Sequence, residues 1–197
     1  MKNVLLFLFF CMLLNMGCKK NLEKIEVDCS KLSQLLREIH KSDQDIRMEG
    51  DFSKIDFDLM RKLDSKNLSK VVSIIEQCGM PTSNEIDKEQ IETIFLVIQH
   101  SSIKYQKEYF PLLEKSSKNG DLKESSIAKL KDRILVYEGK PQVYGTQLKL
   151  NIKTNTSELV ELENPESVNK RRKQVGLEPI QEYLKEYDIE FNVKQIE

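Results

Sequence analysis

Apolar residues recur every three or four positions through the first two thirds of the chain, which is the spacing of helices that bury one face. The first such stretch follows Ser30, a residue type that commonly caps helices, and predicts a helix over residues 31–49 that ends at Gly50. The second predicts a helix over residues 56–77 with Gly79 as its stop signal. Because the two helices are of similar length with a short link, they should lie antiparallel. Their predicted inward residues are Leu32, Leu35, Leu36 and Ile39, and then Leu59, Leu63, Val71, Ile74 and Ile75.

The next apolar stretch is hydrophobic on every side. It runs from Ile94 to Ile98 within a helix predicted over residues 84–107, and an all-round apolar run indicates a central, buried helix. Pro111 should interrupt the chain before a short helix that ends at Lys118, because proline lacks the N–H that a helix interior uses. A further helix is predicted over residues 122–138. Its inward stripe is Ile127, Leu130, Ile134 and Tyr137.

The pattern changes near residue 147, where apolar and polar residues begin to alternate. This alternation predicts a small β-hairpin whose apolar positions are Leu148, Leu150, Ile152, Leu159, Val160 and Leu162. Helices are then predicted from Asn164 to Val175 and over residues 180–187, and the last ten residues are expected to add a short strand. The predicted fold is therefore mainly α: a small multi-helix domain over residues 30–197 with one short β-hairpin near its C-terminal third.

The composition agrees with a single globular domain. The chain has 197 residues, of which 39% are hydrophobic and 32% are charged, and its formal net charge is −1. Nucleic-acid binding would require a basic patch or stripe, so the charge balance excludes nucleic acid as the expected partner.

The first residues have the pattern of an export signal. A single early charge, Lys2, precedes an apolar run from Val4 to Leu14, which is shorter than the roughly 20 residues that a spanning helix needs. Gly17 and Cys18 resemble a lipobox, which predicts a signal peptide over residues 1–17, lipid on Cys18 and a polar tether over residues 18–29. Asn15 and Met16 depart from the usual lipobox residues, so an ordinary cleaved signal peptide is the alternative.

Lipid on Cys18 would make the membrane a partner and the protein an exported, membrane-anchored lipoprotein. Lys19 is not the aspartate that commonly retains lipoproteins in an inner membrane. The expected location is therefore the outer membrane, on its periplasmic or surface side.

Two further cysteines, Cys29 and Cys78, lie before the first predicted helix and at the end of the second. An antiparallel return brings these positions together, and paired cysteines outside the cytoplasm usually form a disulfide. The sequence therefore predicts a Cys29–Cys78 disulfide, with two independent buried thiols as the alternative.

Three polar clusters lie where core residues are expected: Gln99-His100, then Asp132-Arg133 with residues 139–147, and finally Arg171-Arg172. Arg, Gln, Tyr and Thr are rich in hydrogen-bond donors and suit an anionic or carbonyl-bearing ligand. The candidate ligand-binding residues are Gln99, Arg133, Gln142, Tyr144, Thr146, Gln147 and Arg171. Of Arg171 and Arg172, the first is predicted to turn inward.

His100 is the best candidate for general acid–base chemistry, with Asp132 as the carboxylate that orients it. The only other histidine, His40, is far from it in the sequence and no metal-binding spacing is present, so neither a metal nor a cofactor is predicted. The alternative is that these residues are structural, since buried polar groups must be paired wherever they occur.

Several runs resemble a bacterial family, the domain of unknown function numbered 6624. They are DQDIR (43–47), FLVIQHS (95–101), DRILVYEGKPQVYGTQ (132–147) and VNKRRKQVGLEPIQEYL (168–184), and the likeness spans roughly residues 30–187. Where the family often has tryptophan, this chain has Ile94-Phe95 and Met80, which changes packing more than chemistry. The resemblance implies a shared domain and no particular activity.

Two functions follow as hypotheses. The first is a binding or interaction module that holds a small anionic molecule or an envelope protein near His100, Arg133 and residues 140–147. The second is a hydrolase-like enzyme in which His100 is the general base and Tyr144 or Arg133 stabilises developing negative charge.

Overall fold

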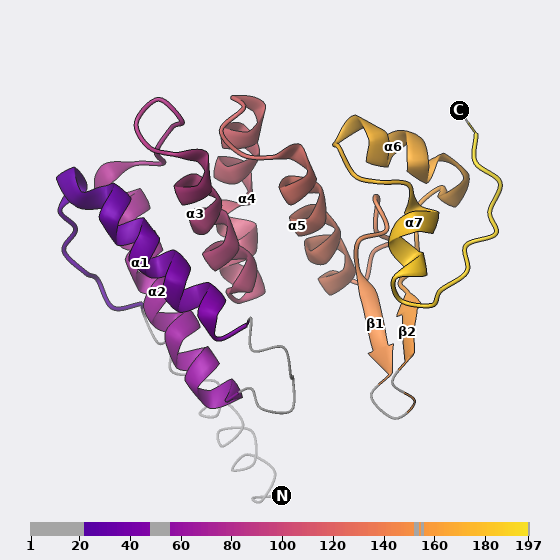
Figure 1. Cartoon of the computed structure of the whole chain (residues 1–197), viewed down its shortest axis with the longest axis horizontal. Coiled ribbons are helices and arrows are strands. Elements are labelled where there is room, and N and C mark those ends of the chain that lie inside the picture. The colour runs from indigo at the N-terminus through magenta and orange to yellow at the C-terminus, as the bar shows by residue number, and fades with distance from the viewer. Residues whose placement is uncertain (1–21, 48–55, 152–153, 155, 197) are drawn as a thin grey trace, which may run out of the picture.

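The computed structural model describes residues 22–47, 56–151, 154 and 156–196 (Figure 1). The predicted signal peptide, Cys18, residues 48–50 at the end of the first predicted helix and Ile152 of the predicted hairpin lie outside these residues.

Seven α-helices and one two-stranded antiparallel sheet make up the described part of the chain, which confirms the predicted fold class. The helices are α1 (Leu32–Asp45), α2 (Phe57–Cys78), α3 (Lys88–His100), α4 (Ile103–Lys118), α5 (Glu124–Tyr137), α6 (Val168–Gln174) and α7 (Ile180–Lys185), and the strands are β1 (Leu148–Asn151) and β2 (Thr156–Leu159). Short 3-10 turns, η1 (Cys29–Lys31) and η3 (Pro165–Ser167), precede α1 and α6.

Helices α1 to α5 form a helical unit around one apolar core (Figure 1). Helices α1 and α2 run antiparallel (Figure 1). This arrangement brings together Cys29, just before α1, and Cys78, the last residue of α2, which form a disulfide with a Cα–Cα distance of 5.7 Å. Helix α3 packs against α1, α2 and α4, as the all-round apolar run predicts for a central helix. The fully buried core residues are Leu36, Ile39, Val71, Ile74, Ile91, Ile94, Ile98, Leu113 and Leu130.

Residues 22–28, which the sequence assigns to a tether, lie along α2. The Ile25 N–H donates to the Ser73 hydroxyl at 3.1 Å, and the Val27 N–H donates to Oε1 of Gln77 at 3.1 Å. Leu22 and Val27 pack against the apolar core of the helical unit. This part of the predicted tether is therefore part of the folded unit.

The helix predicted over residues 84–107 is two helices, because the chain is extended at Ser101 and Ser102. The Ser101 hydroxyl donates to the Ile98 carbonyl at 2.6 Å, and the Gln106 amide donates to the carbonyls of Gln99 and Ser101. These bonds satisfy carbonyls that a continuous helix would have paired with its own N–H groups.

The predicted interruption at Pro111 is wrong, because Pro111 lies inside α4. A proline in a helix interior costs the helix one hydrogen bond. Leu113, two residues later, is fully buried, so packing of α4 onto α3 and α5 outweighs that cost.

Two predicted core residues are also wrong: Leu59 is 46% exposed and Tyr137 is 69% exposed, because each lies at a helix end beyond the core.

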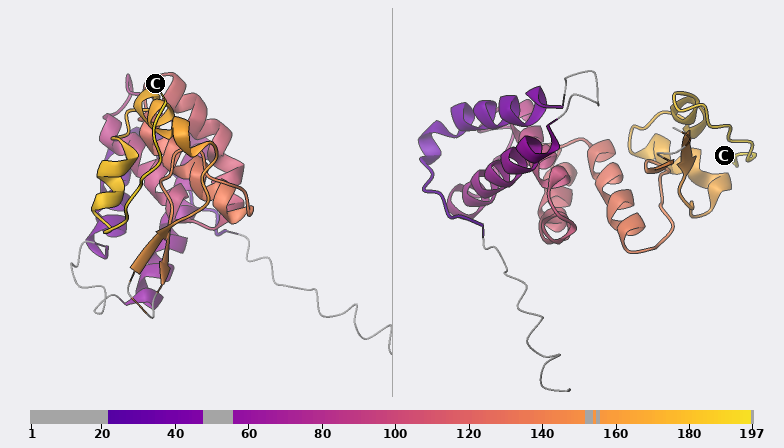
Figure 2. Two further views of the ribbon diagram at one scale, coloured as in Figure 1. Left: turned by 90° about the vertical axis from the view of Figure 1, so that its right-hand side faces the viewer. Right: turned by 90° about the horizontal axis from the view of Figure 1, so that it is seen from below.

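Residues 140–196 form a C-terminal unit with a separate small core of Val168, Ile180 and Leu184. Strand β1 pairs with β2 from Leu148↔Leu159 to Asn151↔Thr156. The two units lie side by side along the long axis of the molecule (Figure 2).

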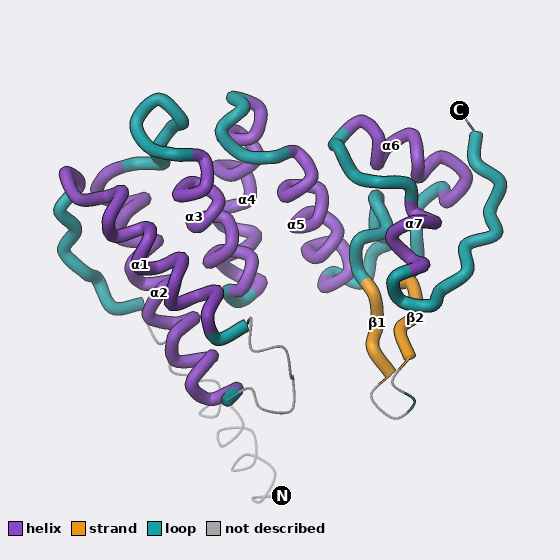
Figure 3. Tube along the Cα trace, in the orientation of Figure 1, coloured by secondary structure: helices purple, strands orange, loops and turns teal. Residues whose placement is uncertain are grey.

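The expected C-terminal strand is absent: residues 188–196 are a loop throughout (Figure 3). The loop is held instead by two contacts to the turn before α6. The Ile196 N–H donates to the Glu166 carbonyl, and the Gln195 amide donates to the Pro165 carbonyl. Within the described ranges, no helix has the length and apolar character needed to cross a membrane.

Candidate ligand-binding site

Asp132 joins the two units. Its side chain is 0% exposed on α5, and both carboxylate oxygens accept hydrogen bonds from the loop over residues 143–146. The donors are the N–H groups of Val143, Tyr144 and Thr146 and the Thr146 hydroxyl, at 2.7–3.1 Å. Asp132 is therefore occupied by the loop and is not the carboxylate that orients His100.

Gln142 and Gln147 organise the same loop from the other side. The fully buried Gln142 amide donates to the carbonyls of Gln147 and Val160, and its oxygen accepts from the Gln147 N–H at 2.8 Å. The Gln147 side chain donates to the Lys129 carbonyl and the Thr146 hydroxyl. The donors that the sequence assigns to a ligand thus contact the protein itself.

The two arginines of α6 bind loop carbonyls. Arg172 is 1% exposed and donates to the carbonyls of Tyr144, Gly145 and Glu178. Arg171 is more exposed and donates to the carbonyls of Val143, Glu163 and Asn164. Arg172, not Arg171, is the arginine that turns inward, because it lies one helical turn after the buried Val168 and shares its face.

Gly145 lets the loop approach α7 closely. Its φ is +71°, and a Cβ at this position would lie 2.5 Å from Cδ1 of Ile180. Only glycine combines this backbone conformation with this contact. The Tyr183 hydroxyl of α7 donates to the next carbonyl, that of Thr146, at 3.1 Å.

His100 pairs with Asp43, a residue of α1. Nδ1 of His100 lies 3.1 Å from Oδ2 of Asp43, whose side chain is 1% exposed, while the histidine side chain is 19% exposed. Arg47 contacts Asp43 at 3.3 Å and Asp64 at 2.6 Å, so an ionic cluster joins α1, α2 and α3. Burial alone would raise the pKa of Asp43, but the hydrogen bond and charge of His100, with the charge of Arg47, hold that pKa below its ordinary value.

Arg133 connects α5 to the end of α3. Its guanidinium donates to the Gln99 carbonyl at 2.9 Å, and Nε contacts Oε1 of Gln147 at 3.5 Å. Burial lowers the pKa of Arg133. These contacts link the first polar cluster of the sequence to the second, whereas the His100 side chain pairs with α1.

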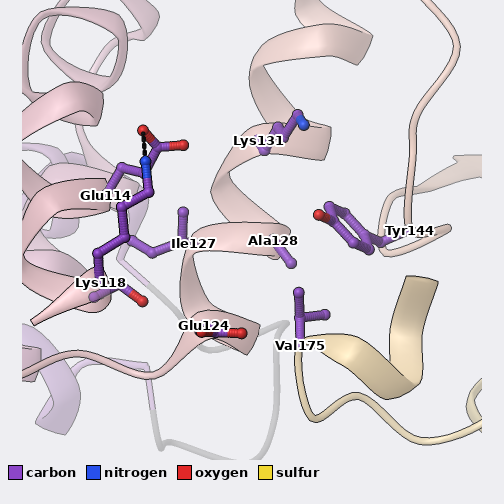
Figure 4. Close-up of a pocket in the computed structure, with 9 residues that line it drawn as sticks. Glu114, Lys118, Glu124, Ile127, Ala128, Lys131, Tyr144 and Val175 are labelled. Atoms are coloured by element: carbon purple, nitrogen blue, oxygen red, sulfur yellow. Dashed lines mark hydrogen bonds and ion pairs between the residues drawn. The ribbon is translucent and has the colours of Figure 1, made fainter. Parts of the chain in front are cut away.

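A cleft lies between the helical unit and the C-terminal unit, next to this network (Figure 4). It has a volume of about 190 Å³, and clefts between structural units are common places for small ligands. Tyr144 and Val175 face α5 across it. The lining residues are Glu114, Ser117, Lys118, Glu124, Ile127, Ala128, Lys131, Tyr144 and Val175.

Some polar groups of the cleft have no ion-pair or hydrogen-bond partner among the residues that the structure describes. Among the residues drawn in Figure 4, only Glu114 and Lys118 form an ion pair, at 2.9 Å. The ammonium of Lys131 lies 5.9 Å from the centre of the Tyr144 ring. Within the described ranges, the buried Ser117 hydroxyl has no hydrogen-bond partner. Burial, and then the charge of Asp132, raise the pKa of Tyr144, so its phenol remains a donor at neutral pH.

Of the predicted ligand-binding residues, the cleft contains only Tyr144. The sequence does not single out Ser117, Glu124 and Lys131, because a serine and charged residues on a helix look like ordinary solvated positions. Nor does it indicate Asp43 as the partner of His100; the i, i+4 spacing of Asp43 and Arg47 indicates only a pair along one helix face. In the part of the chain that the structure describes, no group of three or more His, Cys, Asp or Glu residues could hold a metal.

The chain belongs to a family described as "Family of unknown function (DUF6624)", whose match covers residues 30–195. This match confirms the family that the sequence runs indicate, and it includes both structural units. No curated protein matches the chain, and no solved structure matches it.

Proposed function

We propose that the protein is a lipid-anchored envelope protein whose domain binds a small molecule with an anionic group in the cleft between its two units. The observation that carries this proposal is a pair of polar groups at the cleft that have no ion-pair or hydrogen-bond partner among the described residues: the Lys131 ammonium, which lies 5.9 Å from the centre of the Tyr144 ring, and the Tyr144 hydroxyl. A carboxylate or phosphate there would pair with the lysine ammonium and accept a further hydrogen bond from the tyrosine hydroxyl.

The ligand is small, because the cleft volume of about 190 Å³ is below the roughly 300–1,000 Å³ of pockets for drug-sized molecules. Apolar contacts come from Ile127, Ala128 and Val175. The ligand should therefore combine an anionic group with a short apolar part.

Thermal unfolding followed by circular dichroism tests the binding proposal on the full chain in detergent micelles. The probes are small carboxylates, inorganic phosphate and alanine peptides. A ligand at 100 times its Kd contributes about 2.7 kcal/mol, so at least one probe should raise the midpoint by several degrees. Lys131→Gln should abolish that rise, whereas Lys129→Gln, on the same helix but outside the cleft, should retain it. No rise with any probe contradicts the binding proposal.

The anchoring part of the proposal is supported by the apolar run and by Gly17-Cys18. Cells grown with radiolabelled palmitate should label the wild-type chain and leave a Cys18→Ala variant unlabelled. Equal labelling of the two would rule out lipid on this cysteine.

A second candidate function, hydrolysis, is favoured by the His100–Asp43 pair. A carboxylate that accepts from Nδ1–H holds the imidazole with Nε2 as the base, which is the arrangement of a histidine general base. If the protein hydrolyses an ester or amide, His100→Ala should remove turnover by at least about 100-fold while the fold, measured by circular dichroism, persists. Undiminished turnover in that variant would exclude His100 as the base.

A further inference from the structure

Two charges of opposite sign lie on one face of α5 without an ion-pair partner in the described part of the chain. Glu124 is the first residue of the helix, and Lys131 follows seven positions later. Seven residues are close to two full turns, so the two side chains share a face about 10.5 Å apart along the axis. Glu114 and Lys118, by contrast, neutralise each other on α4. The cleft therefore has one free negative end and one free positive end.

The space between these ends is mainly apolar. Figure 4 shows Ala128 between Glu124 and Lys131, with Val175 and the Tyr144 ring opposite. The Tyr144 hydroxyl points toward α5, and Ser117 of α4 is among the residues that line the cleft. The middle of the cleft suits a small apolar group next to a hydrogen-bond acceptor such as a peptide carbonyl.

We infer that the ligand is a short peptide of two or three residues with a free amino and a free carboxyl terminus. This inference rests on the proposed function, because it names the ligand class of the same cleft. The peptide ammonium lies at Glu124, the carboxylate lies at Lys131, and small side chains contact Ala128 and Val175. An extended chain advances about 3.3–3.6 Å per residue, so the termini of two or three residues lie about 7–10 Å apart, which matches the two charges once their side chains bend inward.

Other small molecules fit these charges less well. A single amino acid carries both charges on one Cα and spans too short a distance to contact Glu124 and Lys131 together. A fatty acid would pair with Lys131 but would bring apolar carbons against the Glu124 carboxylate, which costs desolvation without a partner. A polyamine has no anionic group that could pair with the Lys131 ammonium.

Isothermal titration of the full chain in detergent with four probes tests the inference. They are tri-alanine, di-alanine, N-acetyl-tri-alanine and tri-alanine amide. The free peptides should bind, and each capped form, which lacks one terminal charge, should bind about tenfold more weakly. Circular dichroism of each variant below establishes that it is folded.

Matched variants assign each charge. Glu124→Gln should weaken the free peptide about tenfold and remove its advantage over the N-acetylated form, since the ammonium has lost its partner. Lys131→Gln should weaken the free peptide about tenfold and remove its advantage over tri-alanine amide. Lys129→Gln should leave the affinities of the free and capped peptides unchanged. Equal affinities of free and capped peptides for the wild-type chain would overturn the peptide inference and leave the binding proposal standing if another anion binds. Absence of binding by every peptide and every other anion would overturn both.

Discussion

Replacing Asp132 with alanine should lower the free energy of unfolding by about 4 kcal/mol, one of the two largest stability effects that we expect. The substitution leaves three loop N–H groups, those of Val143, Tyr144 and Thr146, without their acceptor in a place that water reaches poorly. Each buried donor left unpaired costs roughly 1–3 kcal/mol, and partial relaxation of the loop reduces the sum. Urea unfolding followed by circular dichroism measures the loss.

Three control variants separate the carboxylate from the rest of the loop. Asp132→Asn should still destabilise, since both oxygens accept N–H donors and an amide must turn its NH2 toward one set of them. Thr146→Val removes only the hydroxyl bond and should cost about 1 kcal/mol. Asp45→Ala, which loses a surface pair with Lys41, should change stability by less than about 0.5 kcal/mol. An Asp132→Ala variant as stable as the wild-type protein would show that the loop does not depend on this residue.

Removing the disulfide should cost about 4 kcal/mol. Cys29 and Cys78 are 49 positions apart, and closing a loop of this length takes that amount of conformational entropy from the unfolded chain. The double variant Cys29→Ser/Cys78→Ser should therefore unfold at a lower urea concentration than the wild-type protein.

Reduction provides the matched control for this prediction. Dithiothreitol should lower the unfolding midpoint of the wild-type protein to that of the double serine variant, and it should leave the variant unchanged. The prediction fails if the variant and the oxidised wild-type protein unfold at the same urea concentration.

The sequence was sufficient to predict most of the fold, because amphipathic periodicity reports the face that each helix buries. Buried residues such as Leu36, Ile39 and Val71 come directly from that pattern. The errors occur where tertiary contacts override a local rule. Packing keeps Pro111 inside α4, and side-chain bonds from Ser101 and Gln106 end α3 early.

The candidate site was harder to predict, because its residues come from segments distant in the sequence. The GKPQVYGTQ run (139–147) indicates an ordered loop. Only the structure shows that Asp132, Gln142 and Arg172 are the side chains that bind its backbone. Nothing in a linear pattern separates Lys131, which faces the cleft, from Lys129, which does not. The hydrogen-bond partner of a polar side chain depends on how the two units pack together, and the spacing of apolar residues along the chain does not predict that packing.

If Cys18 carries lipid as we propose, the docking of residues 22–28 on α2 limits how far the domain can move from the membrane. With lipid on Cys18, only residues 19–21 would separate the acylated cysteine from the docked segment, and the four Cα–Cα steps from residue 18 to residue 22 extend to at most about 14 Å. Release of the chain as far as Cys29 would extend this reach to about 40 Å, and the Cys29–Cys78 disulfide fixes the far end of that segment. A cleft on a domain tethered so closely could be no farther from the membrane than the domain's own length plus this reach, so a ligand concentrated near the lipid would be available to it.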